Sequence, residues 1–272
     1  MPELPEVETL RRGLEKESVG RRILSVEIVS QKVLKGQSEV EFRDRAVGKC
    51  IVSAGRRGKY LFLPLAVNCL SSPSFTLCLH LNMRGCLRLV TEEVPLEKYG
   101  VLRLVLEEGK ALHFEDMWGW GECRVAITGE SLPKLGEEPL EPDWDRGEFA
   151  RLLSTRRVAI KTVLLDQKIV AGVGNIYADE ALFRAQLAPT RVAATLTVSE
   201  RERLAESIWQ TLTEAVAQGG TRGDYVDLYG QAGRYLPQVY DREGAACPRC
   251  TAPLKKIKLG GRGTTFCLVC QN

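Results

Sequence analysis

The 272-residue chain has no uninterrupted apolar run of about 18 residues, the length that a membrane-spanning helix needs, so no membrane span is expected. It has no internal repeat and no low-complexity tract. Its N-terminus is acidic and lacks an apolar core segment, so we do not expect a secretory signal there. Hydrophobic residues make up 44% and charged residues 27%, as in an ordinary globular protein, and the length suffices for about two domains.

The net charge is small, at +3, but it is unevenly distributed. Residues 241–272 carry six Lys or Arg and two Asp or Glu, a balance of +4, so the preceding residues sum to −1. A basic C-terminal module suggests an anionic partner. A solvated charged tail would have the same composition, so both interpretations stay open at this point.

Residues 1–133 are expected to form a β-rich domain. Val7, Leu10 and Leu14 follow helical spacing, so residues 6–17 are predicted to form a short amphipathic helix, with Pro5 in its first turn. Seven short β-rich segments follow: ILSVEIV, KCIVSAG, KYLFLPL, FTLCLHLNM, GCLRLV, VLRLVL and CRVAI. Their number and spacing predict a two-layer β-sandwich or flattened barrel with the helix packed beside it.

The second half of the chain has a helical pattern. A proline-rich stretch without periodicity, residues 134–145, is predicted to be a linker. Apolar stripes then predict four helices, at residues 146–154, 158–165, 176–185 and 199–217. Ser199 and Glu202 have the spacing of a capping box for the last of these. A glycine-rich segment at about 219–237 is predicted to be a long mobile loop, within a helical domain at 146–240.

The nine cysteines fall into two groups. Five are scattered among strand-like segments and are expected to be buried thiols of an intracellular protein: Cys50, Cys69, Cys78, Cys86 and Cys123. The other four form two Cys-x-x-Cys pairs that are sixteen residues apart: Cys247, Cys250, Cys267 and Cys270. Thiolates from two tight turns can converge on one tetrahedral ion, so this spacing predicts a closed, structural zinc site. A coincidence or a pair of disulfides is the less favoured alternative.

A predicted β-hairpin lies between the two cysteine pairs. It carries Lys255, Lys256, Lys258 and Arg262, which are suited to contact phosphates. A solubilising surface is the alternative, but the flanking GGRG would let backbone approach a ligand closely. We place this zinc-finger β-hairpin module at residues 241–272, and the fold class is therefore α+β and multidomain.

A second motif is AGVGNIYADEALF, at residues 171–183. Gly172 and Gly174 predict a tight turn between two helices, and Asn175 stands where the second helix begins. Asn175 could simply cap this helix. Alternatively, its amide, the N–H groups of the turn and the helix N-terminus together hold a phosphate.

The opening MPELPEVETL is the third motif. If Met1 is removed, Pro2 presents a secondary amine, and an α-amino group is partly unprotonated at neutral pH. Such an amine attacks electrophilic carbon and forms an iminium ion. Glu3 adjoins it and Glu6 lies on the same helical face as Glu3, so both are candidates for proton transfer. Two surface glutamates favoured by the helix dipole are the simpler alternative.

Five segments, in order, resemble bacterial formamidopyrimidine-DNA glycosylases: MPELPEVET, GRRGKYLF, HLNMRG, AGVGNIYADEALF and the terminal four-cysteine finger. The similarity spans essentially the whole chain. The opening resembles this branch more than the endonuclease VIII branch, which usually begins PEGPE. The resemblance implies a bifunctional DNA glycosylase and AP lyase of base excision repair, a DNA-binding cytoplasmic enzyme that works on the nucleoid. It also implies one structural Zn²⁺, a monomer, and double-stranded DNA with a damaged base or an abasic site as the partner.

The resemblance also implies roles for individual residues. Pro2 would attack C1′ of the damaged nucleotide, Glu3 would handle protons at the sugar, and Glu6 would support the site. Lys59 would contact phosphate near the lesion. The residues that would bind or deform the DNA are Asn175, Arg262, Met83 and Tyr240. Met83 would fill the space left by the everted base, although a buried core Met is the alternative.

The sequence departs from the family pattern in two loops. Where the family usually has DPRRFG, this chain has DMWGWG, so Trp118 replaces a base-reading Arg and Trp120 stands at the aromatic wedge. Trp stacks on bases rather than reading their edges through hydrogen bonds, so a preference for cytosine opposite the lesion is not assumed. The other loop carries Arg222, Asp224 and Tyr225 in place of the typical GGTTLxDF text.

We therefore expect the scaffold and chemistry of the family with a lesion spectrum that is shifted toward bulkier or ring-opened bases. The alternatives are a variant that acts on oxidised pyrimidines, alkylated bases or abasic sites, and a damaged-DNA-binding protein without catalysis. A pure binding protein would have no need of Pro2, Glu3 and Lys59 together.

Overall fold

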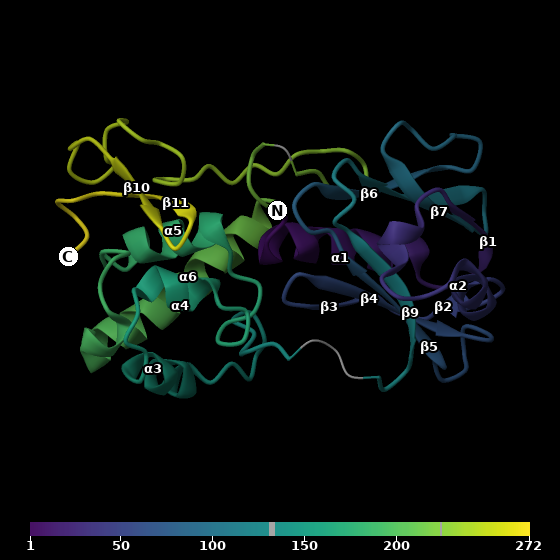
Figure 1. Ribbon diagram of the computed structural model, residues 1–272, viewed down its shortest axis with the longest axis horizontal. Helices are drawn as coiled ribbons and strands as arrows, with labels where there is room; N and C mark the ends of the chain where they lie inside the picture. Colours follow the sequence, from purple (N-terminus) through teal and green to yellow (C-terminus); the bar gives the residue numbers. More distant parts are fainter. Residues whose placement is uncertain (131–133, 224) are drawn as a thin grey trace. The chain divides into compact units, whose positions relative to one another are not determined.

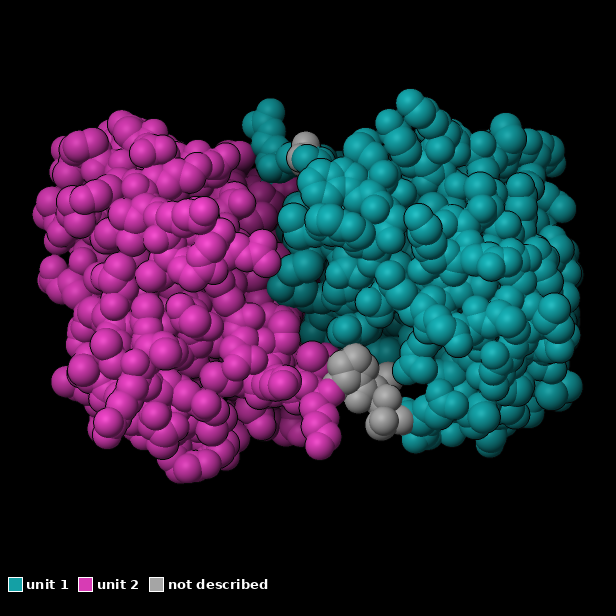
Figure 2. Space-filling model, viewed as in Figure 1, with its two compact units in different colours: residues 1–2, 6–132, 222–233 teal, residues 3–5, 133–221, 234–272 magenta. Residues whose placement is uncertain are grey.

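The protein is described from a computed structural model, which covers residues 1–130, 134–223 and 225–272 (Figure 1). Asp224, in the second departing loop, and the predicted domain end at residue 133 lie outside these described residues. The chain divides into two compact units, shown in different colours in Figure 2. Unit 1 comprises Met1–Pro2, Glu6–Leu132 and Arg222–Gly233, and unit 2 comprises Glu3–Pro5, Pro133–Thr221 and Arg234–Asn272.

Two antiparallel sheets form the body of unit 1. One has the order β1 (Ile23–Ile28), β7 (Gly100–Leu106), β8 (Lys110–Asp116), β6 (Gly85–Thr91). The other has the order β2 (Cys50–Ile51), β4 (Tyr60–Ala66), β5 (Phe75–His80), β9 (Glu122–Ile127), and β3 (Gly55–Arg57) also pairs with β4. The predicted β-sandwich is confirmed.

The alternation of side chains explains how these strands enclose a core. In β4, Leu61, Leu63 and Leu65 are buried, whereas Phe62 and Pro64 between them are only half-buried. Successive side chains of a strand point to opposite faces, so the three leucines face the interior together. Helix α1 (Leu4–Ser18) adds its own apolar side to this core, as its helical spacing predicted.

Three elements of unit 1 escaped the sequence patterns: the strands β3 and β8 and the helix α2 (Glu39–Ala46). Strand β8 has charged residues at both ends and is held as an inner strand by its pairing with β7 and β6. Helix α2 buries only Phe42 and Ala46, which is too narrow a stripe to stand out. A short 3₁₀ helix, η1 (Gln31–Leu34), precedes it.

Unit 2 consists of helices and a small hairpin. The helices are α3 (Arg146–Ser154), α4 (Ile160–Leu165), α5 (Asn175–Arg184), the 3₁₀ helix η2 (Ala193–Thr195) and α6 (Val198–Ala217). The hairpin strands are β10 (Lys255–Leu259) and β11 (Arg262–Phe266). Gly260 and Gly261 join them with positive φ angles of 55° and 79°, as a two-residue hairpin turn requires. None of the described helices is long and apolar enough to cross a bilayer.

The caps of two helices differ from the predictions. Helix α6 begins two residues earlier than the predicted capping box, because Thr197 and Glu200 make the reciprocal bonds and not Ser199 and Glu202. Asn175 does not cap α5, since Gly174 occupies the cap position and Asn175 is the first helical residue. The partner of the free N–H groups of α5 is described below.

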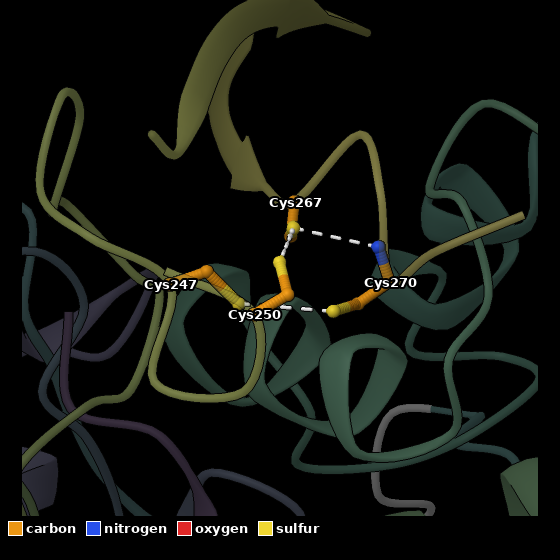
Figure 3. A group of neighbouring side chains, drawn as sticks. All are labelled: Cys247, Cys250, Cys267 and Cys270. Carbon is orange, nitrogen blue, oxygen red and sulfur yellow. Dashed lines mark hydrogen bonds between the residues drawn. The ribbon is translucent and has the colours of Figure 1, made fainter. Parts of the chain in front are cut away.

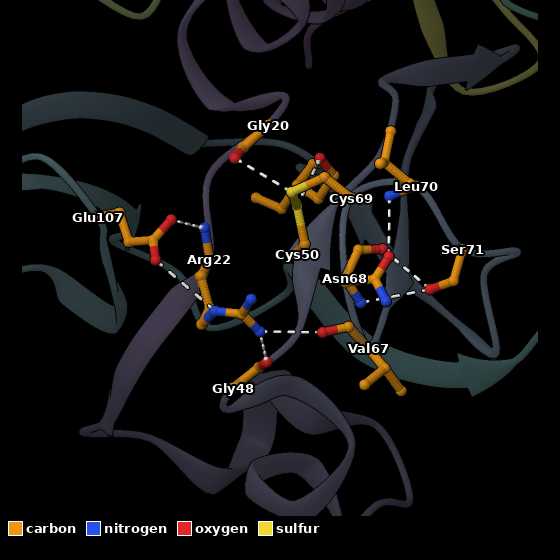
Figure 4. The surroundings of a disulfide bond; sticks show 11 residues. Gly20, Arg22, Gly48, Cys50, Val67, Asn68, Cys69, Leu70, Ser71 and Glu107 are labelled. Atoms are coloured by element: carbon orange, nitrogen blue, oxygen red, sulfur yellow. Dashed lines mark hydrogen bonds and ion pairs between the residues drawn. A yellow bond between two sulfur atoms is a disulfide. The ribbon is translucent and has the colours of Figure 1, made fainter.

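Cys50 and Cys69 form a disulfide, so the prediction of free thiols was wrong for these two residues (Figure 4). Cys50 in β2 pairs with Ala66 in β4, and the chain beyond β4 returns past β2, which brings the two Cα atoms to 5.3 Å. Cys50 is fully buried and Cys69 is exposed. The closed loop contains the β3–β4 hairpin. The other three scattered cysteines are free thiols: Cys78, Cys86 and Cys123.

Replacing Cys69 by Ser should lower the free energy of unfolding by about 3 kcal/mol, because the unfolded chain loses a crosslink across 19 residues. Urea unfolding of both proteins, with and without a mild reductant, measures this. The reductant should destabilise the wild type and have no further effect on Cys69→Ser. Equal stability of the two oxidised proteins would contradict the prediction.

Candidate active site and nucleic-acid interface

The carboxylate of Glu3 binds the N-terminus of α5. One oxygen, Oε2, accepts hydrogen bonds from the backbone N–H groups of Gly174 (2.8 Å) and Tyr177 (3.2 Å), and Oε1 accepts one from Ile176 (2.9 Å). Glu3 is only 3% exposed. Three N–H donors and the positive end of the helix dipole stabilise the anionic form of this carboxylate.

This contact corrects one interpretation of the AGVGN motif. Three N–H groups that could have bound a phosphate are occupied by Glu3. The glycines have a different reason to be there: a Cβ on Gly174 would lie 2.4 Å from Cδ of Glu3, and one on Gly172 would lie 2.6 Å from Leu4. Gly172 also has a φ of +88°, and its carbonyl accepts a hydrogen bond from the N–H of Leu4.

A cavity of about 190 Å³ within unit 1 brings Pro2 and Glu6 together. Its wall is formed by residues from α1, the β5–β6 connection, the loop after β8 and the loop at 222–233: Pro2, Glu6, Leu10, Leu81, Arg84, Gly85, Cys86, Met117, Tyr225 and Val226. Burial raises the pKa of the Cys86 thiol to about 11, so Cys86 is a neutral wall group. Lys59 does not line this cavity.

Lys59 lies in the two-residue turn between β3 and β4 and is 5% exposed. Its charge acts on His80, which lies opposite Tyr60 in the neighbouring strand. Burial and the Lys59 ammonium together lower the pKa of His80 from 6.5 to about 4, so this imidazole is neutral at pH 7. The positive charge of Lys59 thus acts on a neutral imidazole and not on a second cation.

Glu8 is a residue whose role the sequence did not indicate. Its carboxylate accepts hydrogen bonds from Arg11, Arg12 and Arg56, the last at 3.1 Å. Burial opposes its ionisation, but the three guanidinium groups outweigh that effect and lower the pKa of Glu8. Because Arg56 lies in β3, this network fixes the hairpin that carries Lys59 to helix α1. In the sequence, Glu8 was only one of several charged residues near the N-terminus.

The DMWGWG loop connects β8 to β9 and presents two exposed tryptophans. Trp118 and Trp120 are 48% and 50% exposed, and their rings meet edge-to-face with centroids 4.9 Å apart. Asp116 fixes the turn by accepting hydrogen bonds from the N–H groups of Trp118 (3.1 Å) and Gly121 (2.6 Å). The side-chain amide of Asn82 donates to the Trp120 carbonyl. The pair is therefore a rigid aromatic surface.

Met83 lies in the tight turn between β5 and β6, where the N–H of Gly85 donates to the Leu81 carbonyl. It is half-buried, so it is not the fully buried core methionine considered as the alternative. Arg222 is exposed at the start of the loop at 222–233.

Asn175 and Arg262 are brought together in unit 2. The amide of Asn175 donates to the carbonyl of Gly263 at 3.1 Å, directly after Arg262 in the hairpin. Burial raises the pKa of the Tyr240 phenol, and the side chain of Asn175 opposes that shift. The backbone N–H of Tyr240 donates to Glu180, a buried carboxylate that accepts three N–H bonds from residues 238–240.

A buried ion pair seats the hairpin on these helices. Lys161 of α4, which is 0% exposed, lies 2.7 Å from Asp179 of α5. Lys161 also donates to the hydroxyl of Thr264 and the carbonyl of Gly263, and Asp179 accepts from the N–H of Thr265. A buried pair with its remaining hydrogen bonds satisfied defines one geometry. The lone Lys and Asp gave no signal in the sequence.

The four predicted cysteine ligands converge (Figure 3), and their sulfur atoms all lie within 4.8 Å of one another. The Cys247–Cys270 and Cys250–Cys267 sulfur distances are 3.9 and 3.5 Å. Tetrahedral zinc with Zn–S bonds of about 2.3 Å requires sulfur separations of about 3.8 Å. The residues fit one structural Zn²⁺, which would hold the two turns together and leave no position for substrate.

Three family profiles cover almost the whole chain. Residues 1–123 match the formamidopyrimidine-DNA glycosylase N-terminal domain, residues 135–225 its H2TH domain, and residues 244–272 the zinc finger found in FPG and IleRS. A formamidopyrimidine-DNA glycosylase of Pelotomaculum thermopropionicum is 41% identical over 279 residues, covering 100% of this chain and 99% of the relative.

Solved structures of Lactococcus lactis Fpg are also similar. A complex with DNA containing an abasic site has a TM-score of 0.91 at 36% identity, and a wild-type complex with N7-benzyl-Fapy-dG DNA has a TM-score of 0.91 at 37% identity. Each covers 99% of both chains. Fold and site thus define a base-excision-repair DNA glycosylase with AP lyase activity. The chain belongs to the formamidopyrimidine-DNA glycosylase family.

The pKa of His80 tests the environment of Lys59. The chain has two histidines, so NMR can follow the His80 ring directly, with a midpoint expected near pH 4. Lys59→Met should raise this midpoint because it removes a nearby positive charge, although burial should keep it below 6.5. The exposed Lys98→Met is the control and should leave it unchanged.

The lowered pKa of His80 also makes the stability of the folded protein depend on pH. The folded protein keeps His80 neutral, whereas the unfolded chain protonates it near pH 6.5, so this contribution to stability is lost as the pH falls from 6.5 toward 4. An unchanged His80 midpoint in Lys59→Met would show that the two groups do not interact.

Proposed function

We propose that Pro2, freed by removal of Met1, is the nucleophile. Its secondary amine attacks C1′ of the damaged nucleotide, the glycosidic bond breaks with its electron pair going to the base, and the base leaves after taking up a proton. C1′ then carries both O4′ and the Pro2 nitrogen, which has lost its proton. Protonation of O4′ and cleavage of the C1′–O4′ bond open the sugar ring and leave an iminium ion. Loss of a C2′ proton from this ion expels the 3′ phosphate and nicks the strand. The cavity that contains both Pro2 and Glu6 is the single observation that carries this proposal.

Glu3 acts as a fixed anion. With three N–H donors on its carboxylate, the negative charge is stabilised beside the residue that becomes positively charged in the iminium ion. A carboxylate in this state accepts protons rather than donating them. Glu6, which lines the cavity with Pro2, is then the better candidate to take the proton from the attacking amine and pass it to the departing base.

The remaining residues bind DNA. Lys59 contacts a phosphate near the lesion, supported by its position on a hairpin fixed to α1 through Glu8 and Arg56. Asn175, Arg262 and Tyr240 contact the DNA backbone as one cluster. The amide of Asn175 bonds the carbonyl of Gly263 next to Arg262, and the Asn175 side chain affects the pKa of Tyr240. Met83, half-buried on its turn, fills the stack where the base has left.

We infer that the substrates are oxidised or ring-opened purines, including bulky ones, in the DNA of the cytoplasmic nucleoid. Tyr225 and Val226 line the cavity and would contact the everted base. They belong to the loop whose sequence differs from the family-typical GGTTLxDF. Trp118 and Trp120 would stack in the strand opposite the lesion. Every base offers a face for stacking, so we expect little discrimination between opposite bases.

Borohydride trapping on a duplex with an abasic site tests the nucleophile. Wild-type protein lacking Met1 should give a covalent adduct, and Pro2→Gly should reduce its yield by at least about tenfold, because a primary amine at a more flexible terminus replaces the secondary amine. Mass spectrometry establishes Met1 removal in both proteins. Absence of an adduct with the processed wild type would refute the lyase mechanism.

Excision rates opposite each of the four bases test the tryptophans. The wild-type rates should agree within about threefold, whereas Trp118→Arg should favour cytosine by about tenfold or more, because a guanidinium reads base edges through directed hydrogen bonds. Trp118→Phe retains a stacking ring and is the matched control. A strong preference for cytosine in the wild type, with efficient removal of 8-oxoguanine, would show that the spectrum is not altered.

A further inference from the structure

The loop at 222–233 ends in a compact turn that Asp227 closes. Its side chain accepts hydrogen bonds from the N–H groups of Tyr229 and Gln231, both at 2.9 Å, and its backbone N–H donates to the Gln231 carbonyl at 2.9 Å. Val226 and Ala232 form an isolated bridge at the base of this turn. The tip of the loop, residues 226–232, is therefore held in shape by its own hydrogen bonds.

Leu228 fixes this turn to the core of unit 1. It is 1% exposed and belongs to the same apolar cluster as the two sheets. Its side chain lies over Gly13 of helix α1, where an added Cβ would come within 2.9 Å of Leu228 Cδ1. Its carbonyl accepts a hydrogen bond from the N–H of Leu89 in β6 at 2.8 Å.

Tyr229 makes a second, polar attachment to the same helix. Its hydroxyl donates to Glu17 Oε1 at 2.6 Å, and Lys110 donates to the other oxygen of Glu17 at 2.6 Å. The hydrogen bonds from Lys110 and Tyr229 lower the pKa of Glu17 to about 2, and the bond to Glu17 raises the pKa of Tyr229 to about 12. At neutral pH the pair is thus a phenol donating to a carboxylate.

We propose that Leu228 on Gly13 and Tyr229 on Glu17, together the tip anchor, are positioning residues for base excision. Tyr225 and Val226, which line the cavity of Pro2 and Glu6, directly precede the anchored turn. The anchor therefore determines where these two residues stand over the cavity. This inference rests on the proposed function, in which the cavity receives the everted base.

Gly13 supports this interpretation independently. It lies inside a helix of 15 residues, where glycine is less favourable than alanine. At this position an added side chain would displace Leu228, which explains why a glycine stands in the helix. The packing of Leu228 against α1 thus outweighs the lower helix propensity of glycine at residue 13.

The anchor should matter for one reaction and not for the other. Excision of a base requires the base to be held against Tyr225 and Val226, whereas an abasic site has no base for these residues to contact. Displacement of Tyr225 and Val226 should therefore slow base excision, because small displacements near reacting groups strongly reduce the rate. Strand cleavage at an abasic site should continue.

Gly13→Ala and Tyr229→Phe are the test variants, made in the full-length zinc-loaded protein. Single-turnover rates are measured on a duplex with a ring-opened purine and on one with an abasic site, together with the melting temperature. Gly13→Ala should slow excision by about tenfold and Tyr229→Phe by about threefold, with abasic cleavage within about twofold of wild type. Alanine favours the helix but displaces the buried Leu228, so Gly13→Ala should lower the melting temperature less than a core truncation does.

Val33→Ala is the control, since it removes apolar contacts from the same core away from the loop. It should lower the melting temperature and leave the ratio of the two rates unchanged. Equal loss of both activities in Gly13→Ala, or no loss of either, would overturn the anchor while leaving the proposed function intact. A wild type that cleaves abasic DNA but excises no damaged purine would overturn the proposed function, and the anchor with it.

Discussion

The bond between the Glu3 carboxylate and the first turn of α5 is the interaction on which the rest of the site depends. Without it, three N–H groups at a buried helix end would lack partners, and a buried carboxylate would lack donors. The bond also fixes Glu3, the residue that follows the proposed nucleophile Pro2, to the backbone of a helix far away in sequence. Of the two glycines in the turn, Gly174 leaves room for the Glu3 side chain and Gly172 leaves room for Leu4.

Several other features act in the same way, by fixing a group that we propose to contact DNA. Glu8 and Arg56 hold the hairpin of Lys59, Asp116 holds the two tryptophans, and the Lys161–Asp179 pair holds the hairpin of Arg262. In each case a buried or half-buried charge makes hydrogen bonds to the hairpin or loop that carries the group. Preorganisation of this kind reduces the entropy lost on binding.

The sequence predicted features that depend on local spacing. The cysteine ligands, the hairpin between them, the helices of unit 2 and the strands with strong apolar alternation were all found from their patterns. It missed features that depend on contacts between distant residues. The cap of α5 comes from a residue about 170 positions away, and the Cys50–Cys69 bond follows from strand register, so neither leaves a local pattern. The roles of individual site residues rest on resemblance and stay proposals.

The two sulfur sites of this chain require opposite conditions of assembly. The Cys50–Cys69 bond forms by oxidation, whereas the four thiolates of the finger bind zinc only when they are reduced and deprotonated. In the metal-free chain those thiols lie close enough to pair with one another. Zinc must therefore enter before an oxidant does, and a preparation oxidised without metal would lock the hairpin of Arg262 into disulfides that exclude the ion.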